Sequence, residues 1–208
     1  MWQPDPFPHT VVDGWFADSD LRVVVDEWPA LTDPRWRVYG DSYEAGKMEG
    51  SNPAMWGPTA SELLRHLCSG EVCRVLGELT GIDGLVADTI GGGLHCSPTG
   101  ARLAMHVDFN RHPNRRDLYR RLNLLVFLVD GYDPAWGGQL LLGQGDGQVV
   151  VEPRFNRTAV FATSEASVHG HPTPWAGPVP RRSIAVYYFA PEPPERDAEP
   201  HSTTWHSA

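Results

Sequence analysis

The pattern of apolar and polar positions changes near residue 84. Upstream of that point, apolar residues recur at helical spacing in two segments, whereas downstream they form short continuous or alternating runs separated by Gly, Pro and Asp. The change predicts helical and loop support over residues 1–83, a strand-rich core over 84–190 and a Pro-rich polar tail over 191–208. We expect the first two parts to form a single domain and the tail to be loosely held.

Two helices are expected in the first part. One follows a cap at Asp18 or Ser19, continues through "DLRVVVDEWP" and ends at Pro29, because proline cannot continue a helix. The other starts near residue 59 or 61 and continues as one element to Gly81, a residue type favoured at helix C-termini. Between them, residues 36–58 are rich in Gly, Pro and aromatics, which is typical of a functional loop or of an ordered surface loop.

The second part contains a series of short runs that predict strands. These runs are "LVADTIGGGLHC", "RLAMHVDF", "RLNLLVFLVD", "GGQLLLG", "QVVVEP", "TAVFAT", "SVHGHP" and "RSIAVYYFA". The intervening "GQGDGQ" is typical of a hairpin turn. Many short strands with frequent turns predict a mainly β protein with flanking helices (α+β), built on an antiparallel barrel or sandwich.

Composition indicates a globular protein of one domain. Its 208 residues suffice for a core, and 41% are hydrophobic while 21% are charged. No apolar run reaches membrane-spanning length and the first residues lack the regions of a signal peptide, so we expect a cytoplasmic protein with no membrane partner. The odd, low count of cysteines (Cys68, Cys73 and Cys96) predicts buried thiols rather than disulfides or a zinc site.

The net charge of -9 argues against a nucleic-acid partner. One basic cluster, "RHPNRRDLYRR" at residues 111–121, departs from this acidic character. It is interpreted either as a solvated loop that leads into a strand or as a patch that faces an anionic substrate or cosubstrate.

The "HVD" of residues 106–108 carries the strongest chemical signal. Because side chains alternate along a strand, His106 and Asp108 face the same way, and a buried carboxylate beside an imidazole is unfavourable unless something such as a metal ion compensates it. Two imidazoles and one carboxylate form the facial arrangement that binds Fe(II) and leaves positions open. His95, His169 and His171 lie on expected strands or their edges, and spacing alone does not choose the third ligand.

A second pattern lies in "RRSIAVYYFA". Arg181 and Ser183 share one face of the expected strand, and Arg182 points to the other. A guanidinium beside a hydroxyl is a receptor for a carboxylate.

Taken together, several segments resemble the Fe(II)/2-oxoglutarate-dependent dioxygenases of the prolyl-hydroxylase-type branch. The matching segments are "GGGLHCSPTGARLAMHVDFN", "RLNLLVFLVDGYDPAWGGQLLL", "PRFNRTAVFAT", "SVHGHP" and "RRSIAVYY", in the order of the family over about residues 88–190. The resemblance implies a double-stranded β-helix, a jelly-roll and cupin-like barrel with helices outside. It also implies Fe(II) as metal, 2-oxoglutarate as cosubstrate and O2 as oxidant.

The resemblance also assigns roles to residues. It makes His106, Asp108 and His169 the metal ligands, and Arg181 the residue that holds the distal carboxylate of 2-oxoglutarate with help from Ser183. The strand face that lines the cosubstrate pocket carries Asn123, Leu125 and Phe127, with Asn123 expected to make a polar contact and Phe127 standing where some relatives have tyrosine.

Further residues are expected near the substrate or behind the ligands: His95, Arg121, Trp136, His171, Glu44 and Lys47. His95 is interpreted equally as a core histidine. Glu44 and Lys47 lie in the loop of residues 36–58 beside several aromatics, where they would recognise a polar substrate or be solvated.

The implied reaction is hydroxylation of an unactivated C–H of a small molecule or amino acid, with succinate and CO2 as co-products. The same ligands also support desaturation, epoxidation and cyclisation. Hydroxylation of a peptide or protein residue such as proline is the alternative. A non-enzymatic jelly-roll binding module and a cupin-like metalloenzyme without a cosubstrate are the other classes. The sequence indicates no oligomeric state.

Overall fold

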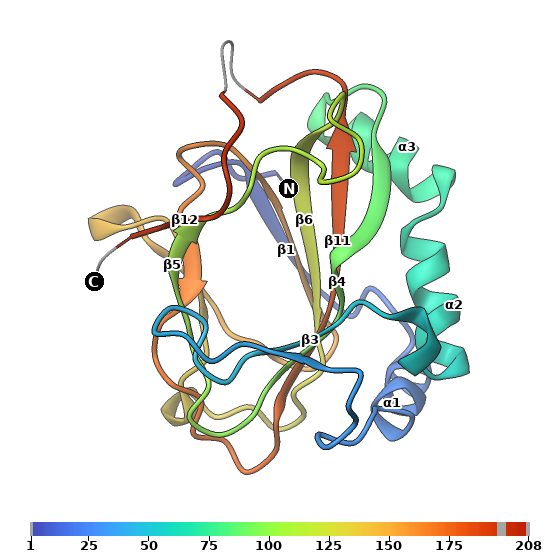
Figure 1. The fold of residues 1–208 in the computed structure, drawn as a ribbon, viewed down its shortest axis with the longest axis vertical. Helices are drawn as coiled ribbons and strands as arrows, with labels where there is room; N and C mark the ends of the chain where they lie inside the picture. The colour runs from blue at the N-terminus through green and yellow to red at the C-terminus, as the bar shows by residue number, and fades with distance from the viewer. Residues whose placement is uncertain (1, 195–198, 207–208) are drawn as a thin grey trace.

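In a computed structural model that describes residues 2–194 and 199–206, the chain forms two facing antiparallel sheets with helices on one side (Figure 1). The larger sheet contains, in spatial order, β1 (His9–Asp13), β9 (Arg157–Ala162), β6 (Tyr119–Phe127), β11 (Arg181–Ala190), β4 (Val86–Ser97), β3 (Met48–Gly50) and β2 (Arg37–Val38). The smaller sheet contains β12 (Thr204–Trp205), β5 (Leu103–Val107), β10 (His169–His171), β7 (Leu140–Leu142) and β8 (Val149–Val151). The predicted mainly β architecture is therefore confirmed.

Alternation along the central strands separates the packing core from the site. On β11, Ile184, Val186 and Tyr188 point toward the helices and join the largest buried apolar cluster. Ser183 and Tyr187, on the opposite face, border the space between the two sheets. One strand thus packs the support with one face and builds the site with the other.

The helices cover the outer face of the larger sheet (Figure 1). They are α1 (Asp18–Asp26), α2 (Pro58–Leu67) and α3 (Gly70–Thr80). The prediction of one long helix from residue 59 or 61 to Gly81 is wrong, because the side chain of Ser69 accepts a hydrogen bond from the Val72 N–H at 3.3 Å and starts a new helix. Gly81 ends α3 in the left-handed conformation with φ 72°, as expected.

Each predicted run of the second part forms a strand, from β4 to β11. The "GQGDGQ" segment connects the antiparallel strands β7 and β8 through a 3-10 turn at Gly145–Gly147, so the hairpin is confirmed. Strands β1, β2, β3 and β12 were not predicted. The first three are short or exposed on part of their length, and β12 lies in the tail.

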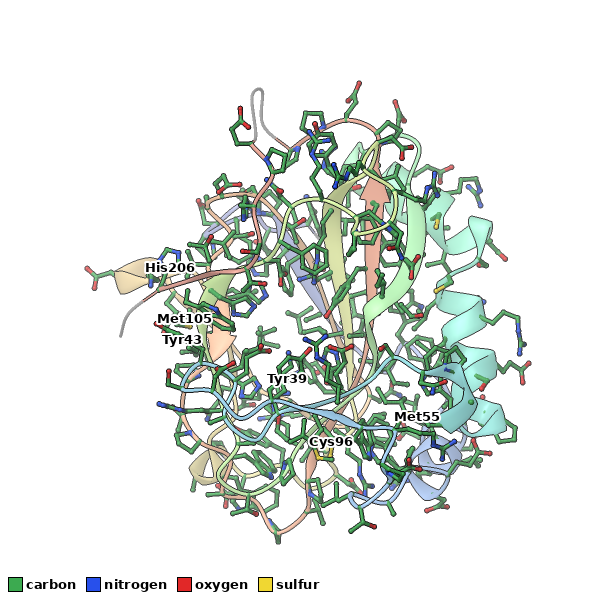
Figure 2. The ribbon with its side chains drawn as sticks, viewed as in Figure 1. Tyr39, Tyr43, Met55, Cys96, Met105 and His206 are labelled. Carbon is green, nitrogen blue, oxygen red and sulfur yellow. The ribbon has the colours of Figure 1, made fainter. Side chains whose placement is uncertain are left out.

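The expectation of a loosely held tail is wrong for residues 199–206. The Asn110 side chain donates to the Glu199 carbonyl at 2.7 Å and accepts from the His201 N–H at 3.0 Å. β12 then pairs with β5, with Trp205 opposite His106. Figure 2 shows His206 beside Met105, and Tyr43, which stacks on Trp205 with ring centroids 4.9 Å apart, close to them.

The cysteines agree with the expectation of thiols. Cys68, Cys73 and Cys96 are free, and burial raises the pKa of Cys96 to about 11. No helix in the described part of the chain is both long and apolar enough to cross a membrane.

We predict that Asn110→Ala releases the tail. Both bonds of the buried Asn110 side chain would be lost, so the free energy of unfolding should fall by about 1–3 kcal/mol. Urea denaturation measures this loss, and hydrogen exchange should be faster in the amides of residues 199–206. Asn114→Ala, at an exposed position of the same segment, is the control and should change neither. Unchanged exchange in the tail of Asn110→Ala would contradict the prediction.

Candidate active site

Two histidines from neighbouring strands of the smaller sheet meet an aspartate just beyond the end of β5. His106 and His169 are cross-strand partners, with ring centroids 4.4 Å apart. The Nε2 atom of His106 lies 3.5 Å from Asp108 Oδ1, and that of His169 lies 3.4 Å from Asp108 Oδ2. One donor atom from each residue lies within 4.8 Å of the others. The structure therefore brings the three predicted ligands together.

Glycine at position 170 permits this pairing. A Cβ atom there would lie 2.6 Å from the Ala104 carbonyl oxygen of β5, which is too close for any side chain. The "HGH" spacing thus lets β10 approach β5 closely enough for His169 to stand beside His106.

Backbone carbonyls fix the orientation of both imidazoles. Nδ1 of His106 lies 2.9 Å from the Ala104 carbonyl oxygen and Nδ1 of His169 lies 2.8 Å from that of Ser167. A carbonyl only accepts, so each Nδ1 carries the proton and each Nε2 presents a lone pair toward Asp108. Burial lowers the pKa of His169 to about 3, which keeps its ring neutral.

Two lone pairs and a carboxylate facing one another form an electron-rich pocket that suits a divalent cation. Two neutral imidazoles and one carboxylate are the donor set of a facial triad for Fe(II). The residues present therefore fit the metal that the sequence analysis expects.

Asp108 is held by two further side chains. Its Oδ2 accepts a hydrogen bond from Asn123 Nδ2 at 2.7 Å and lies 3.1 Å from Arg120 Nη2. Arg120 also donates from Nε to Asn123 Oδ1 at 2.8 Å, and its guanidinium lies over the Tyr187 ring. Burial alone would raise the pKa of Asp108, but Arg120 and the imidazoles hold it well below its usual value. Oδ1 is then the oxygen with more free lone pairs for a cation.

Arg120, not the predicted Arg121, reaches the site. The pairing of β11 with β6 shifts where Tyr188 faces Leu122 and Phe189 faces Arg120, so Arg121 is the extra residue of a bulge. The bulge turns the Arg120 side chain inward, where it is 2% exposed.

Arg121 instead donates to the Glu192 carbonyl at 2.7 Å, on the outside. On a regular strand, residues two apart share a face, so Arg121 would face the same way as Asn123. The sequence alone gives no signal for the bulge that changes this. Arg115 and Arg116 of the same basic cluster are exposed, which agrees with a solvated loop for that part.

A cavity of about 70 Å³, here called the inner cavity, extends from the triad to Arg181. Arg181 is 5% exposed. Among the described residues, the one hydrogen bond of its side chain runs from Nε to the Gly138 carbonyl at 2.7 Å. Burial lowers its pKa to about 10, so it stays charged at neutral pH. It forms no ion pair with any described acid, and both terminal nitrogens are therefore available to a carboxylate.

Most of the other predicted residues also line the inner cavity: Ser183, Asn123, Leu125, His95, His171 and Lys47. Asn123 donates one Nδ2 hydrogen to Asp108, and its expected contact with the cosubstrate stays a prediction for the other Nδ2 hydrogen. Phe127 lies under the Arg181 guanidinium, with the ring centroid 5.1 Å away. Trp136 does not line the inner cavity and packs against Tyr132 and Trp175 instead.

Two features of the polar lining of the inner cavity were not predicted. His171 is 4% exposed, and its Nδ1 has no hydrogen-bond partner among the described residues. Ser97, which the sequence analysis missed, pairs with Arg181 across β4 and β11 and lines the same space. Neither feature follows from motif spacing, because both depend on strand register.

A larger cavity of about 400 Å³, here called the outer cavity, adjoins the triad through His106 and Asp108. Most of its walls come from three segments: the residues of the loop, β2 and β3 (Arg37, Tyr39, Glu44, Lys47, Glu49 and Ser51), the β4 residues Ile90 and Gly91, and the tail residues Thr203 and Trp205. Phe109, Pro113, Arg120 and Tyr187 complete the lining. Glu44 and Lys47 were predicted and form an ion pair of 3.0 Å. Glu49 and Trp205 were not predicted, since short β3 and the tail gave no strand signal.

Comparison with known proteins agrees with this geometry. Residues 92–189 match the sequence profile described as the 2OG-Fe(II) oxygenase superfamily, and this segment contains the three candidate ligands and Arg181. No curated protein matches the chain.

Solved structures share the fold. A prolyl-4-hydroxylase from Pseudomonas putida is 17% identical with a TM-score of 0.63, covering 88% of this chain and 92% of that one. A prolyl hydroxylase from Trichoplax adhaerens, in complex with a hypoxia inducible factor peptide fragment, is 19% identical with a TM-score of 0.65 over 87% and 83%. HygX from Streptomyces hygroscopicus, with nickel, 2-oxoglutarate and hygromycin B bound, is 14% identical with a TM-score of 0.58 over 96% and 92%. The predicted double-stranded β-helix is confirmed.

We predict that Arg120→Met destabilises the metal-free protein by about 3 kcal/mol, because removal of one partner leaves the buried Asp108 carboxylate without its cation. A saturating divalent ion such as Mn²⁺ should recover much of this loss. Thermal and urea unfolding with and without Mn²⁺ measure the difference. Arg121→Met is the matched control and should cost less, with no dependence on metal. Equal losses in both variants would show that Arg120 does not stabilise Asp108.

Proposed function

We propose that the chain is a 2OG-Fe(II) oxygenase, which the match of residues 92–189 to the profile of that superfamily supports, and that it hydroxylates an unactivated C–H bond of a small molecule or free amino acid. Fe(II), 2-oxoglutarate and O2 are its cofactor and cosubstrates. One observation carries the proposal. Three metal donors stand at one end of the inner cavity, and a buried guanidinium that forms no ion pair with a described acid stands at the other.

Each group of the inner cavity has a role in this proposal. His106, Asp108 and His169 would hold the metal, and Arg181 would bind the distal carboxylate of 2-oxoglutarate with Ser183 beside it. When bound, Fe(II) with 2-oxoglutarate and O2 supplies the oxidising chemistry, with succinate and CO2 as co-products.

The chain itself orients and shields these groups. Apolar side chains such as Leu125, Leu140 and Phe161 line the inner cavity and exclude water. Arg120 and Asn123 hold one oxygen of Asp108, so the carboxylate keeps a fixed direction toward the metal position.

The outer cavity supports a small substrate. Its volume of about 400 Å³ lies in the range of small-molecule sites, and the loop around Glu44 and the tail at Trp205 wall it from two sides. HygX, a structural neighbour, is described with hygromycin B bound, which supports a small molecule as well.

A peptide prolyl residue is the second candidate. The structural neighbours from Pseudomonas putida and Trichoplax adhaerens are prolyl hydroxylases, and the second is described in complex with a peptide fragment. Succinate release separates the two candidates when free amino acids and small metabolites are screened against proline-containing peptides.

We expect anaerobic addition of Fe(II) and 2-oxoglutarate to give the weak visible charge-transfer band of the chelate. Asp108→Ala should lose this band and the succinate release, since one donor and its charge are removed. A jelly-roll binding module would give no band in the wild-type chain. A metalloenzyme without cosubstrate would bind the metal but not 2-oxoglutarate.

We further predict that Arg181→Ala raises the Kd of 2-oxoglutarate about 100-fold, because two charge-assisted hydrogen bonds are lost. Calorimetric titration of the Mn²⁺-loaded protein measures the Kd, and a separate titration shows whether Mn²⁺ affinity is kept. Arg182→Ala is the matched control, because Arg182 points to the other face of β11 and lies over Trp28. An unchanged Kd in Arg181→Ala would refute the proposed role.

A further inference from the structure

The outer cavity contains a buried carboxylate that the proposed reaction does not use. Glu49 lies in the middle of β3, is 5% exposed and lines this cavity. It accepts hydrogen bonds from the Tyr39 hydroxyl and from Ser51 Oγ, the latter at 2.9 Å. Among the described residues, no Lys, Arg or His forms an ion pair with it.

Such a carboxylate is incompletely satisfied. Its two oxygens offer about four acceptor positions, and the two hydroxyl donors fill only part of them. Burial alone would raise the pKa of Glu49, but the hydrogen bonds from Tyr39 and Ser51 and the nearby Lys47 ammonium hold it below its ordinary value. Glu49 is therefore a buried anion at neutral pH, which is unfavourable unless a cation joins it.

Strand register aims Glu49 toward the reaction centre. Glu49 pairs with His95, which in turn pairs with Ser183, and directly paired residues of antiparallel strands share a face. All three therefore face the interior between the sheets. The outer cavity also touches His106 and Asp108, so a molecule that fills it meets Glu49 and the metal donors together.

Two of the other charged side chains of the outer cavity are already paired, and a third is exposed. Lys47 lies 3.0 Å from Glu44, and Arg120 lies 3.1 Å from Asp108. Arg37 is exposed and lies over the Tyr39 ring at 4.7 Å, although it is the register partner of Glu49. Among the described residues that line this cavity, Glu49 is thus the acid without a cation.

We propose that the outer cavity selects a substrate that carries an ammonium or another cationic nitrogen, and that the Glu49 carboxylate is its receptor. The proposal rests on the proposed function, since it names the substrate class of the same site. The cation would donate charge-assisted hydrogen bonds to the free lone pairs of Glu49. The net charge of -9 draws cations toward the protein at long range.

A binding experiment tests the preference with three probes of similar size. Butylammonium, 1-butanol and butyrate are titrated into the full chain loaded with Zn²⁺ and 2-oxoglutarate, and saturation-transfer NMR measures each Kd. We expect butylammonium to bind at least tenfold more tightly than the alcohol or the acid. Comparable Kd values, tighter butyrate binding or no measurable butylammonium binding would overturn the proposal, and none of these outcomes depends on a variant.

Variants assign the preference to Glu49. Glu49→Gln keeps the size of the side chain and should weaken butylammonium binding about tenfold to 100-fold. Ser51→Ala removes a hydrogen-bond donor but keeps the carboxylate, and Asp130→Asn removes an exposed acid that pairs with Arg22 and does not line the outer cavity. Both should keep the preference for the cation. An equal loss in Asp130→Asn would show that general acidity, not Glu49, causes the preference.

Turnover provides the functional readout. Succinate release is compared for L-lysine, spermidine and hygromycin B against their N-acetylated forms. We expect stimulation by at least one free amine and none by its acetylated form. Stimulation by the acetylated compounds overturns the proposal. Failure of the wild-type protein to bind Mn²⁺ and 2-oxoglutarate would instead refute the proposed function. The three probes are then titrated into the unloaded full chain, so the cation preference is measured separately from it.

Discussion

The pairing of His106 with His169 across β5 and β10 is the constraint on which the rest of the site depends. The pairing sets two imidazoles side by side, and the backbone carbonyls behind them leave both Nε2 lone pairs facing Asp108. The resulting concentration of electron pairs in a buried place is unfavourable without a cation, and Arg120 compensates part of it from the far side of the carboxylate. A single glycine, Gly170, permits this approach of the two strands.

Two buried charged side chains of opposite sign lie on either side of this centre, and neither forms an ion pair with a described residue. Arg181, at the far end of the inner cavity, forms no ion pair among the described residues, and neither does Glu49 in the outer cavity. Burying an unpaired charged group lowers the stability of the folded chain. Binding sites retain such groups where a ligand of opposite charge compensates this penalty. The same physical argument therefore assigns an anion to one cavity and a cation to the other.

The sequence predicted those parts of the structure that depend on local patterns. The strands from β4 to β11 and the alternation that sets Arg181 and Ser183 on one face follow from periodicity and turn residues. The expected cap of α1 at Asp18 or Ser19 is wrong by one or two residues, because Ala17 precedes the helix and no side chain caps it. Some of the features that it missed depend on contacts between distant segments. The bulge that exchanges Arg121 for Arg120 arises where β6 pairs with β11, and no residue type marks it.

The order of the tail has the same origin, whereas two other differences do not. The order of residues 199–206 comes from Asn110 and from pairing with β5, so a Pro-rich polar composition gave the wrong expectation there. The break between α2 and α3 does have a local signal, since Ser69 precedes Gly70, but apolar spacing that continued across it concealed the cap. Glu49 was missed for another reason, because its strand β3 has three residues and therefore too few alternations to recognise.

The two cavities differ in which part of the chain builds them, and this difference bears on the substrate. The metal donors, Arg181 and Ser183 all lie within residues 92–189, the segment that matches the oxygenase superfamily. The walls of the outer cavity come largely from outside it, from residues 37–51, from Ile90 and Gly91 and from the tail. In the proposed function, the oxygenase chemistry would reside in the matched segment and substrate selection in the segments around it, since loops vary most readily among proteins of one fold. For this reason the substrate has to be inferred from the charges of the outer cavity itself rather than transferred from the prolyl hydroxylases that share its fold.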